Sequence, residues 1–236
     1  MRIGGIVRVA RRRPSGVWEA SYHNTQTNWA LYSLAEWYLG TSNTSGNTGA
    51  ILPPTYIALG TGSTTTGPQV SDIAMYAETY GTRQAISYTA IYGGNEAQLT
   101  TTYATTAAVG SWSEAGFWDS NVGSATVGSA GATQGSTTLP LGANAPAVAG
   151  GSTAGQYNTA YINDGANSEY ISLAASASSG ATSWSLQSAL LHAHAAATPI
   201  VVFVGNLWAH VAFSPAVTKS SGEQLSVQWA VPFSIA

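Results

Sequence analysis

Two histidines separated by one residue are the pair in this chain that most suggests metal chemistry. His192 and His194 would lie on one face of a strand, and two imidazoles placed in this way form half of a metal site. Asp164 and Glu169 are the available carboxylates, but no fixed spacing ties either of them to the histidines. The interpretation that we favour places both histidines in a loop or a subunit contact. We therefore predict neither a metal ion nor a cofactor.

Hydrolytic chemistry is only weakly indicated. Many serines accompany the four histidines, but no Gly-x-Ser-x-Gly elbow marks a nucleophile. Glu114 and Asp119 could serve a polysaccharide-cleaving enzyme, yet at five residues apart on a regular strand they face opposite ways. Glu114 is expected to pair with Arg83 or to accept backbone N–H groups, because a charge in so aromatic a run needs a partner. The segment 60–62, Gly-Thr-Gly, lacks the lysine of a phosphate loop and is predicted to be a turn. We predict that the protein is not an enzyme.

Arginines near the N-terminus form the remaining candidate site. Five of the seven basic residues lie in the first thirteen positions, whereas all ten acidic residues follow Pro14. A solvated turn would explain these arginines about as well as a binding role would. The functional interpretation that we favour is docking onto an acidic protein surface by Arg8, Arg11, Arg12 and Arg13. Nucleic acid is not an expected partner, because no second basic patch would continue a phosphate track.

Composition favours a protein that works against neighbouring chains. Charged residues make up 7% of the sequence, against roughly 25% in average globular proteins, while 44% are hydrophobic and argue against disorder. Surfaces of hydroxyls and amides are common where subunits pack, since an unpaired charge is costly to bury. We expect a homo-oligomer, with a trimer favoured. The chain has no cysteine, and no stretch approaches the ~18 apolar residues of a membrane span, so no membrane partner is expected.

Most segments that would position these residues are predicted strands. The runs 207–213 and 225–233 alternate apolar residues at period two, which is typical of strands with one buried face, and Ser214-Pro215 is expected to end the first run. Residues 3–9 and 17–22 are predicted to form a hairpin with the arginines near its tip.

Two further predictions concern the helix and the tryptophans. One helix is expected over 28–39, with one apolar face and Gly40 at its end. The tryptophans at alternating strand positions are interpreted as core rather than sugar-stacking platforms: Trp18, Trp37, Trp112, Trp118, Trp184, Trp208 and Trp229.

A change of composition near Gly123 predicts an inserted module. From there the chain is rich in small residues, and aromatic residues resume at Trp208. We predict an all-β protein: a discontinuous β-sandwich-like domain carrying one α-helix, with a second small β module inserted. The predicted bounds are 1–23 for an N-terminal hairpin, 24–122 plus 206–236 for the discontinuous domain, and 123–205 for the insertion.

Several short motifs outside the insertion occur in a familiar order. They are Tyr-Ile-Ala-Leu-Gly-Thr-Gly at 56–62, an acid and Arg83, Trp-Ser-Glu-Ala-Gly-Phe-Trp-Asp at 112–119, Ala-Phe-Ser-Pro at 212–215, and Lys219. Together with the expected helix before them, these motifs resemble a domain of tailed-bacteriophage virion proteins, including tail-fibre and tail-collar-like proteins. The resemblance covers most of 24–119 and 206–236. The insertion, with Asp164-Gly165, Glu169 and Leu-His-Ala-His at 191–194, resembles small β modules of phage structural proteins.

This resemblance implies a structural component of the virion, made in the host cytoplasm, with other virion proteins as partners. A tail-fibre, collar or baseplate-associated attachment protein is the expected role, with a host surface glycan as a further partner. The alternatives are a capsid decoration or head-fibre protein, and a polysaccharide-binding or depolymerising tail protein.

Overall fold

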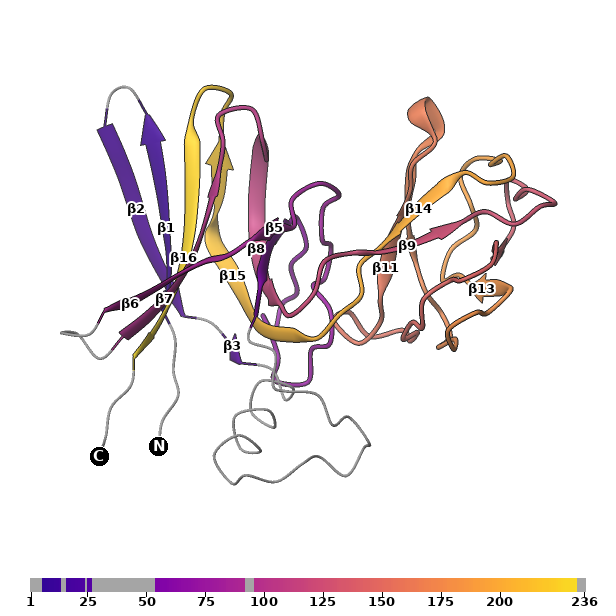
Figure 1. The fold of residues 1–236 in the computed structure, drawn as a ribbon, viewed down its shortest axis with the longest axis horizontal. Coiled ribbons are helices and arrows are strands. Elements are labelled where there is room, and N and C mark those ends of the chain that lie inside the picture. The colour runs from indigo at the N-terminus through magenta and orange to yellow at the C-terminus, as the bar shows by residue number, and fades with distance from the viewer. Residues whose placement is uncertain (1–5, 14–15, 24, 27–53, 92–95, 233–236) are drawn as a thin grey trace. The chain divides into compact units, whose positions relative to one another are not determined.

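The described part of the chain is all-β and forms two compact units. A computed structural model describes residues 6–13, 16–23, 25–26, 54–91 and 96–232 (Figure 1). Unit 1 comprises 1–120 with 206–236, and unit 2 comprises 121–205. All strand pairs in these ranges are antiparallel, and their only helical element is a single 3-10 turn, Gly165–Asn167. The helix expected over 28–39 lies outside the described residues.

Unit 1 is built from two five-stranded sheets (Figure 1). The first, in the order β2-β1-β16-β7-β6, contains β1 (Ile6–Arg13), β2 (Gly16–His23), β6 (Ser87–Ile91), β7 (Glu96–Tyr103) and β16 (Gln224–Pro232). The second, in the order β3-β15-β8-β4-β5, contains β3 (Thr25–Gln26), β4 (Tyr56–Gly60), β5 (Gln84–Ala85), β8 (Gly110–Trp118) and β15 (Leu207–Lys219). The hairpin β1–β2 is part of the first sheet, because β1 also pairs with β16 along its length.

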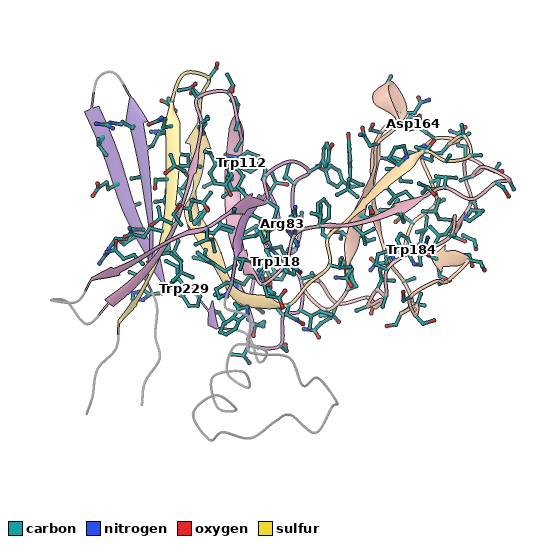
Figure 2. All side chains as sticks on the ribbon, viewed as in Figure 1. Arg83, Trp112, Trp118, Asp164, Trp184 and Trp229 are labelled. Atoms are coloured by element: carbon teal, nitrogen blue, oxygen red, sulfur yellow. The ribbon has the colours of Figure 1, made fainter. Side chains whose placement is uncertain are left out.

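One hydrophobic core joins the two sheets, so unit 1 is a β-sandwich. Leu225, Val227 and Trp229 of β16 are buried at period two, as expected from the sequence. They share this core with residues of β8 and β15, and the rings of Trp229 and Phe117 lie 5.1 Å apart (Figure 2). The connection 220–223 therefore passes from one sheet to the other, because β15 and β16 belong to different sheets.

The second sheet is buried on both faces. The connection between β4 and β5, residues 61–83, lies over the face that points away from the sandwich core, and we call it the covering segment. With residues of β4, β8 and β15 it forms a further hydrophobic cluster, which consists of Ala58, Ala74, Met75, Trp118 and Leu207. The expectation that 207–213 has one buried face is therefore wrong, because His210 is 0% exposed on the covered face. Trp208 is also buried, but it belongs to the sandwich core, beside a register shift between Leu207 and Ala209. Residues 114–118 of β8 are also all buried. A period-two pattern cannot reveal a chain segment that covers the other face.

Two predicted breaks lie inside strands. β15 does not end at Ser214-Pro215 but continues to Lys219, and its register with β8 shifts between Ala212 and Val217. This bulge accommodates a proline, which has no N–H group to donate to the ladder. Likewise, β1 extends through Arg13 rather than turning at the arginines, because its backbone stays paired with β16 as far as Arg12 and with β2 as far as Arg13.

Unit 2 has a smaller core and little regular structure. A four-stranded sheet has the order β12-β11-β14-β9 and contains β9 (Gly123–Thr126), β11 (Thr159–Ile162), β12 (Glu169–Ser172) and β14 (Pro199–Val202). A two-stranded sheet pairs β10 (Thr138–Pro140) with β13 (Ser183–Ser185). Sixteen buried apolar residues form one core, in which Trp184 is 1% exposed (Figure 2). Within the described ranges no helix is long and apolar enough to cross a membrane.

Candidate functional site

The arginines of β1 lie on both faces of the first sheet. Arg8 and Arg12 alternate with the buried Val7 and Val9 and are exposed. Arg8 donates from Nη1 to Oε1 of Gln228, 3.3 Å away.

Arg11 lies on the core side, at the end of the sandwich. Its Nη1 donates to the carbonyl oxygen of Thr218, and its Nε lies 3.9 Å from Oε2 of Glu223. Its side chain is 15% exposed. These contacts belong to the packing of unit 1, so Arg11 is held inside the fold, unlike Arg8 and Arg12. The structure does not describe the side chain of Arg13.

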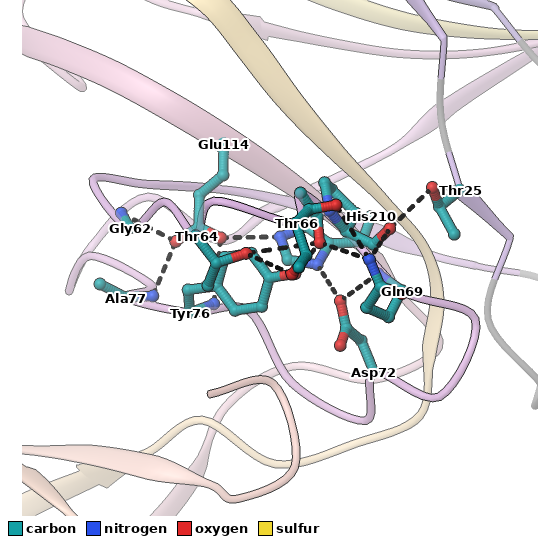
Figure 3. A network of polar contacts seen from close by, with 12 residues as sticks. Thr25, Gly62, Thr64, Thr66, Gln69, Asp72, Tyr76, Ala77, Glu114 and His210 are labelled. Atoms are coloured by element: carbon teal, nitrogen blue, oxygen red, sulfur yellow. Dashed lines mark hydrogen bonds and ion pairs between the residues drawn. The ribbon is translucent and has the colours of Figure 1, made fainter. Parts of the chain in front are cut away.

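A buried histidine joins two carboxylates in unit 1. His210 of β15 has its Nδ1 2.9 Å from Oδ2 of Asp72 and its Nε2 2.7 Å from Oε2 of Glu114 (Figure 3). All three residues are at most 3% exposed. A neutral imidazole has one N–H, so only the imidazolium donates to both carboxylates. We call Asp72, Glu114 and His210 the His210 network.

Glu114 also anchors the backbone of the covering segment. Its Oε1 accepts N–H bonds from Gly62 and Ala77, at 3.0 and 2.7 Å, and its Oε2 accepts one from Tyr76 at 3.0 Å (Figure 3). Of the two roles expected for Glu114, acceptance of backbone N–H groups is confirmed and pairing with Arg83 is not.

Position 60 requires a glycine, because the carboxylate of Glu114 and the backbone of Ala77 lie close to its backbone. A Cβ on Gly60 would lie 2.4 Å from Oε1 of Glu114 and 2.5 Å from the backbone oxygen of Ala77. The predicted turn at 60–62 therefore contains the residues that bring the covering segment onto Glu114.

A second buried ion pair ties the end of the covering segment to β8. Arg83 binds Glu78 through two hydrogen bonds, Nε to Oε1 at 2.8 Å and Nη2 to Oε2 at 2.7 Å. Its guanidinium lies 4.1 Å from the ring centroid of Trp118 (Figure 2), and Nη1 donates to the carbonyl oxygen of Ser120. Burial raises the pKa of Glu78, and the charge of Arg83 offsets part of that effect.

Unit 2 contains a network of the same kind. The Nδ1 of His194 lies 2.9 Å from Oδ2 of Asp164, and its Nε2 lies 2.9 Å from Oε1 of Glu169. Glu169 accepts the backbone N–H groups of Leu191 and His192 at 2.9 and 3.0 Å. The network therefore holds the segment after β13 against β12.

The alternative in which His192 and His194 share a strand face is wrong, whereas the favoured placement of both histidines in a loop agrees with the structure. This segment is irregular, with only an isolated bridge between His194 and Ala132. Both ring nitrogens of His194 face carboxylates, and across the described ranges no three His, Cys, Asp or Glu side chains are arranged to hold a metal ion. The carboxylates suggested for a metal site are thus brought to His194 as hydrogen-bond partners.

The remaining candidates are also held in structural contacts. Asp119 follows β8 and accepts from Asn206, through Nδ2 at 2.6 Å and the backbone N–H at 2.9 Å. Five tryptophans are at most 5% exposed, which confirms their interpretation as core: Trp112, Trp118, Trp184, Trp208 and Trp229. Trp37 lies outside the described residues, as does the side chain of Trp18.

Sequence reasoning missed His210 as the centre of a network. It lies in an alternating apolar strand, where a polar residue signals either solvent or a buried partner. The position of His210 between Ala209 and Val211, in a run without charges, was the one sign that its side chain is buried. Its partners Glu114 and Asp72 lie 96 and 138 residues away in sequence. Such separations cannot be paired from one sequence.

The pH dependence of stability should report on the His210 network. Burial acts to lower the pKa of His210, but the hydrogen bonds and charges of Asp72 and Glu114 outweigh it and raise this pKa overall. A raised folded-state pKa means that the network stabilises the fold fully below the unfolded pKa of about 6.5 and loses this contribution as pH rises through the folded-state value. Urea midpoints measured across this range should fall with pH in the wild type, and this component should be absent in His210→Asn. Parallel curves for the two proteins would contradict the prediction.

Comparisons of the sequence and the fold with known proteins found no similar protein. The chain matches no protein-family model, no curated protein and no solved structure.

Proposed function

We propose that the protein is a non-enzymatic structural component of a tailed-bacteriophage particle, located in the tail as a fibre, collar or baseplate-associated attachment protein. The observation that carries the proposal is the arrangement of the motifs that resemble phage virion proteins. Residues 56–60, 112–118 and 212–219 belong to β4, β8 and β15, which are neighbours in one sheet. The segments are far apart in sequence, so their adjacency supports treating them as one structural element.

The buried charges support a structural role for this sheet. His210 binds Glu114, and Arg83 binds Glu78. Glu114 also binds backbone N–H groups of the covering segment, so these buried charges are directed at the protein and not into a solvent-filled pocket. Both nitrogens of His210 are engaged, so neither is available to act as a general base in this arrangement. Fixing a surface loop through a buried polar network is a means of specifying one conformation.

Antibody labelling of purified particles in the electron microscope tests the proposal. Gold particles on the tail are expected. Gold on the head would favour the alternative of a capsid decoration or head-fibre protein, and unlabelled particles would contradict a virion role. Release of reducing ends from host glycan by the purified protein would instead support the depolymerase alternative.

The proposed docking role now rests on Arg8, Arg12 and Arg13, since Arg11 is held by Glu223 and Thr218. Arg12 and Arg13 are tested together. The double variant Arg12→Ser/Arg13→Ser should be incorporated into particles several-fold less than the wild type, because attraction to an acidic partner is lost. An exposed charge such as that of Arg12 contributes under about 1 kcal/mol to stability, and we expect the variant to keep the wild-type urea midpoint.

Added salt supplies the control for this prediction. Salt should weaken incorporation of the wild type, because screening acts on the same attraction, and should have little effect on the variant. Equal incorporation of both proteins at low salt would contradict the docking role and would mean that these arginines are only solvated.

A further inference from the structure

A hollow in the outer face of the first sheet has the polar groups of a ligand site. Its volume is about 180 Å³, and it lies over β1 between β2 and β16. Five polar side chains line it, namely Arg8, Glu19, Ser21, Ser226 and Gln228. Ala10 is the strand residue directly opposite both Glu19 and Ser226. The hollow exists because this central position carries a methyl group while its neighbours carry longer side chains.

Opposite charges line this hollow without meeting. Arg8 is paired across the strands with Ser21 and Gln228. Glu19 is paired with Ala10, two residues further along β1 on the same face. Arg8 donates to Gln228, and across the described ranges the carboxylate of Glu19 makes no hydrogen bond or ion pair. A donor that Gln228 positions and a carboxylate acceptor therefore line the same hollow.

The pair of charges selects the chemistry of an occupant. A phosphate or carboxylate would suit the guanidinium but would be repelled by Glu19, and an ammonium group would suit Glu19 but not Arg8. A hydroxyl both accepts from a guanidinium and donates to a carboxylate, and the hydroxyls of Ser21 and Ser226 can do either. Neighbouring hydroxyls on an uncharged ring would satisfy Arg8 and Glu19 at once.

The size and surroundings suit one sugar unit of a longer chain. At about 30 Å³ for each water molecule, the hollow has the volume of roughly six waters. Further along the same face, Gln98 and Thr100 of β7 form hydrogen bonds with the amide of Gln228. The face beyond the hollow is thus uncharged and polar at these positions, as contact with further hydroxyls requires.

We propose that this hollow binds a neutral monosaccharide unit of a glycan, with Arg8 donating to and Glu19 accepting from adjacent hydroxyls. The inference deepens the proposed attachment role and rests on it for the source of the glycan, a host surface. Binding itself is a property of the isolated chain and is measured without the particle.

Nuclear magnetic resonance of the ¹⁵N-labelled full chain tests the site directly. The probes are glucose, galactose, N-acetylglucosamine and rhamnose, with inorganic phosphate as a separate arm. At least one sugar should shift the amide signals of 8–10, 19–21 and 226–228 saturably, with a Kd on the order of 1 mM. Phosphate should not shift them.

Filling the hollow provides the matched comparison. Ala10→Leu should weaken sugar binding at least tenfold. Ser87→Leu places the same side chain at an exposed position of β6, on the same face of the sheet and directly across the strands from Arg8, and should bind as the wild type does. Glu19→Gln removes the charged acceptor and should also weaken binding severalfold. The amide spectrum of each variant shows that it is folded.

Three results would overturn the proposal: no sugar shifts these amides, Ala10→Leu binds as tightly as Ser87→Leu, or phosphate alone binds and identifies an anion site. A protein found in particles that binds none of the sugars would lose this site and keep the proposed function. A protein that binds sugar but is absent from particles would keep the site and lose the virion role.

Discussion

Glu114→Ala should lower the free energy of unfolding by about 3–5 kcal/mol, because it breaks a buried charged network by removing one partner. Three backbone N–H groups, from Gly62, Tyr76 and Ala77, lose their acceptor, and His210 loses one of its two carboxylates. A domain has about 5–15 kcal/mol of stability in total, so much of it would be lost. Urea denaturation followed by tryptophan fluorescence measures the change.

Glu19→Ala is the matched control for this prediction. Glu19 is exposed on β2 and has no hydrogen-bond or ion-pair partner in the described ranges, so its removal should change stability by no more than about 0.5 kcal/mol. If both glutamate variants unfold at similar urea concentrations, the network around Glu114 does not hold the covering segment.

Arg83→Met should also cost about 3–5 kcal/mol, because it leaves the carboxylate of Glu78 buried with 1% exposure and no cation. It removes the stacking on Trp118 and the bond to Ser120 as well. Uptake of a proton by Glu78 would limit the loss, since burial already raises its pKa. The loss should therefore be smaller at acidic pH than at neutral pH.

The double variant Glu78→Leu/Arg83→Met separates the ion pair from the packing. Apolar replacements of a buried pair are often neutral, so the double variant should recover at least half of the stability lost by Arg83→Met. A double variant as unstable as the sum of the two single variants would show that the two residues act independently.

The sequence predicted the strands better than their partners. Alternation is confirmed at Leu225, Val227 and Trp229, because that face of β16 packs on the second sheet, while Ser226 and Gln228 on the other face are partly exposed. The same pattern at 207–213 was misleading, because the covering segment hides the second face of β15. Burial on that face depends on a segment more than a hundred residues away, and no local pattern records it.

The candidate site divides in the same way. The aromatic neighbours of Glu114 indicated that its carboxylate needs a partner, but they did not indicate which one. Arg83 binds Glu78, which is closer to it in sequence, and Glu114 binds backbone N–H groups instead. His194, Asp164 and Glu169 were considered together only as an unfavoured metal site, and nothing in the sequence indicated that they form a hydrogen-bonded network. Residue types indicate which groups seek partners, and only the topology decides which ones meet.

The number of copies of this protein in a purified particle tests the proposed virion role most directly. Quantitative mass spectrometry against a major capsid protein should find a small multiple of three or six copies, as expected for a tail part built from symmetric oligomers. Tens to hundreds of copies would contradict the tail position and favour capsid decoration. Absence of the protein from particles would contradict the virion role itself.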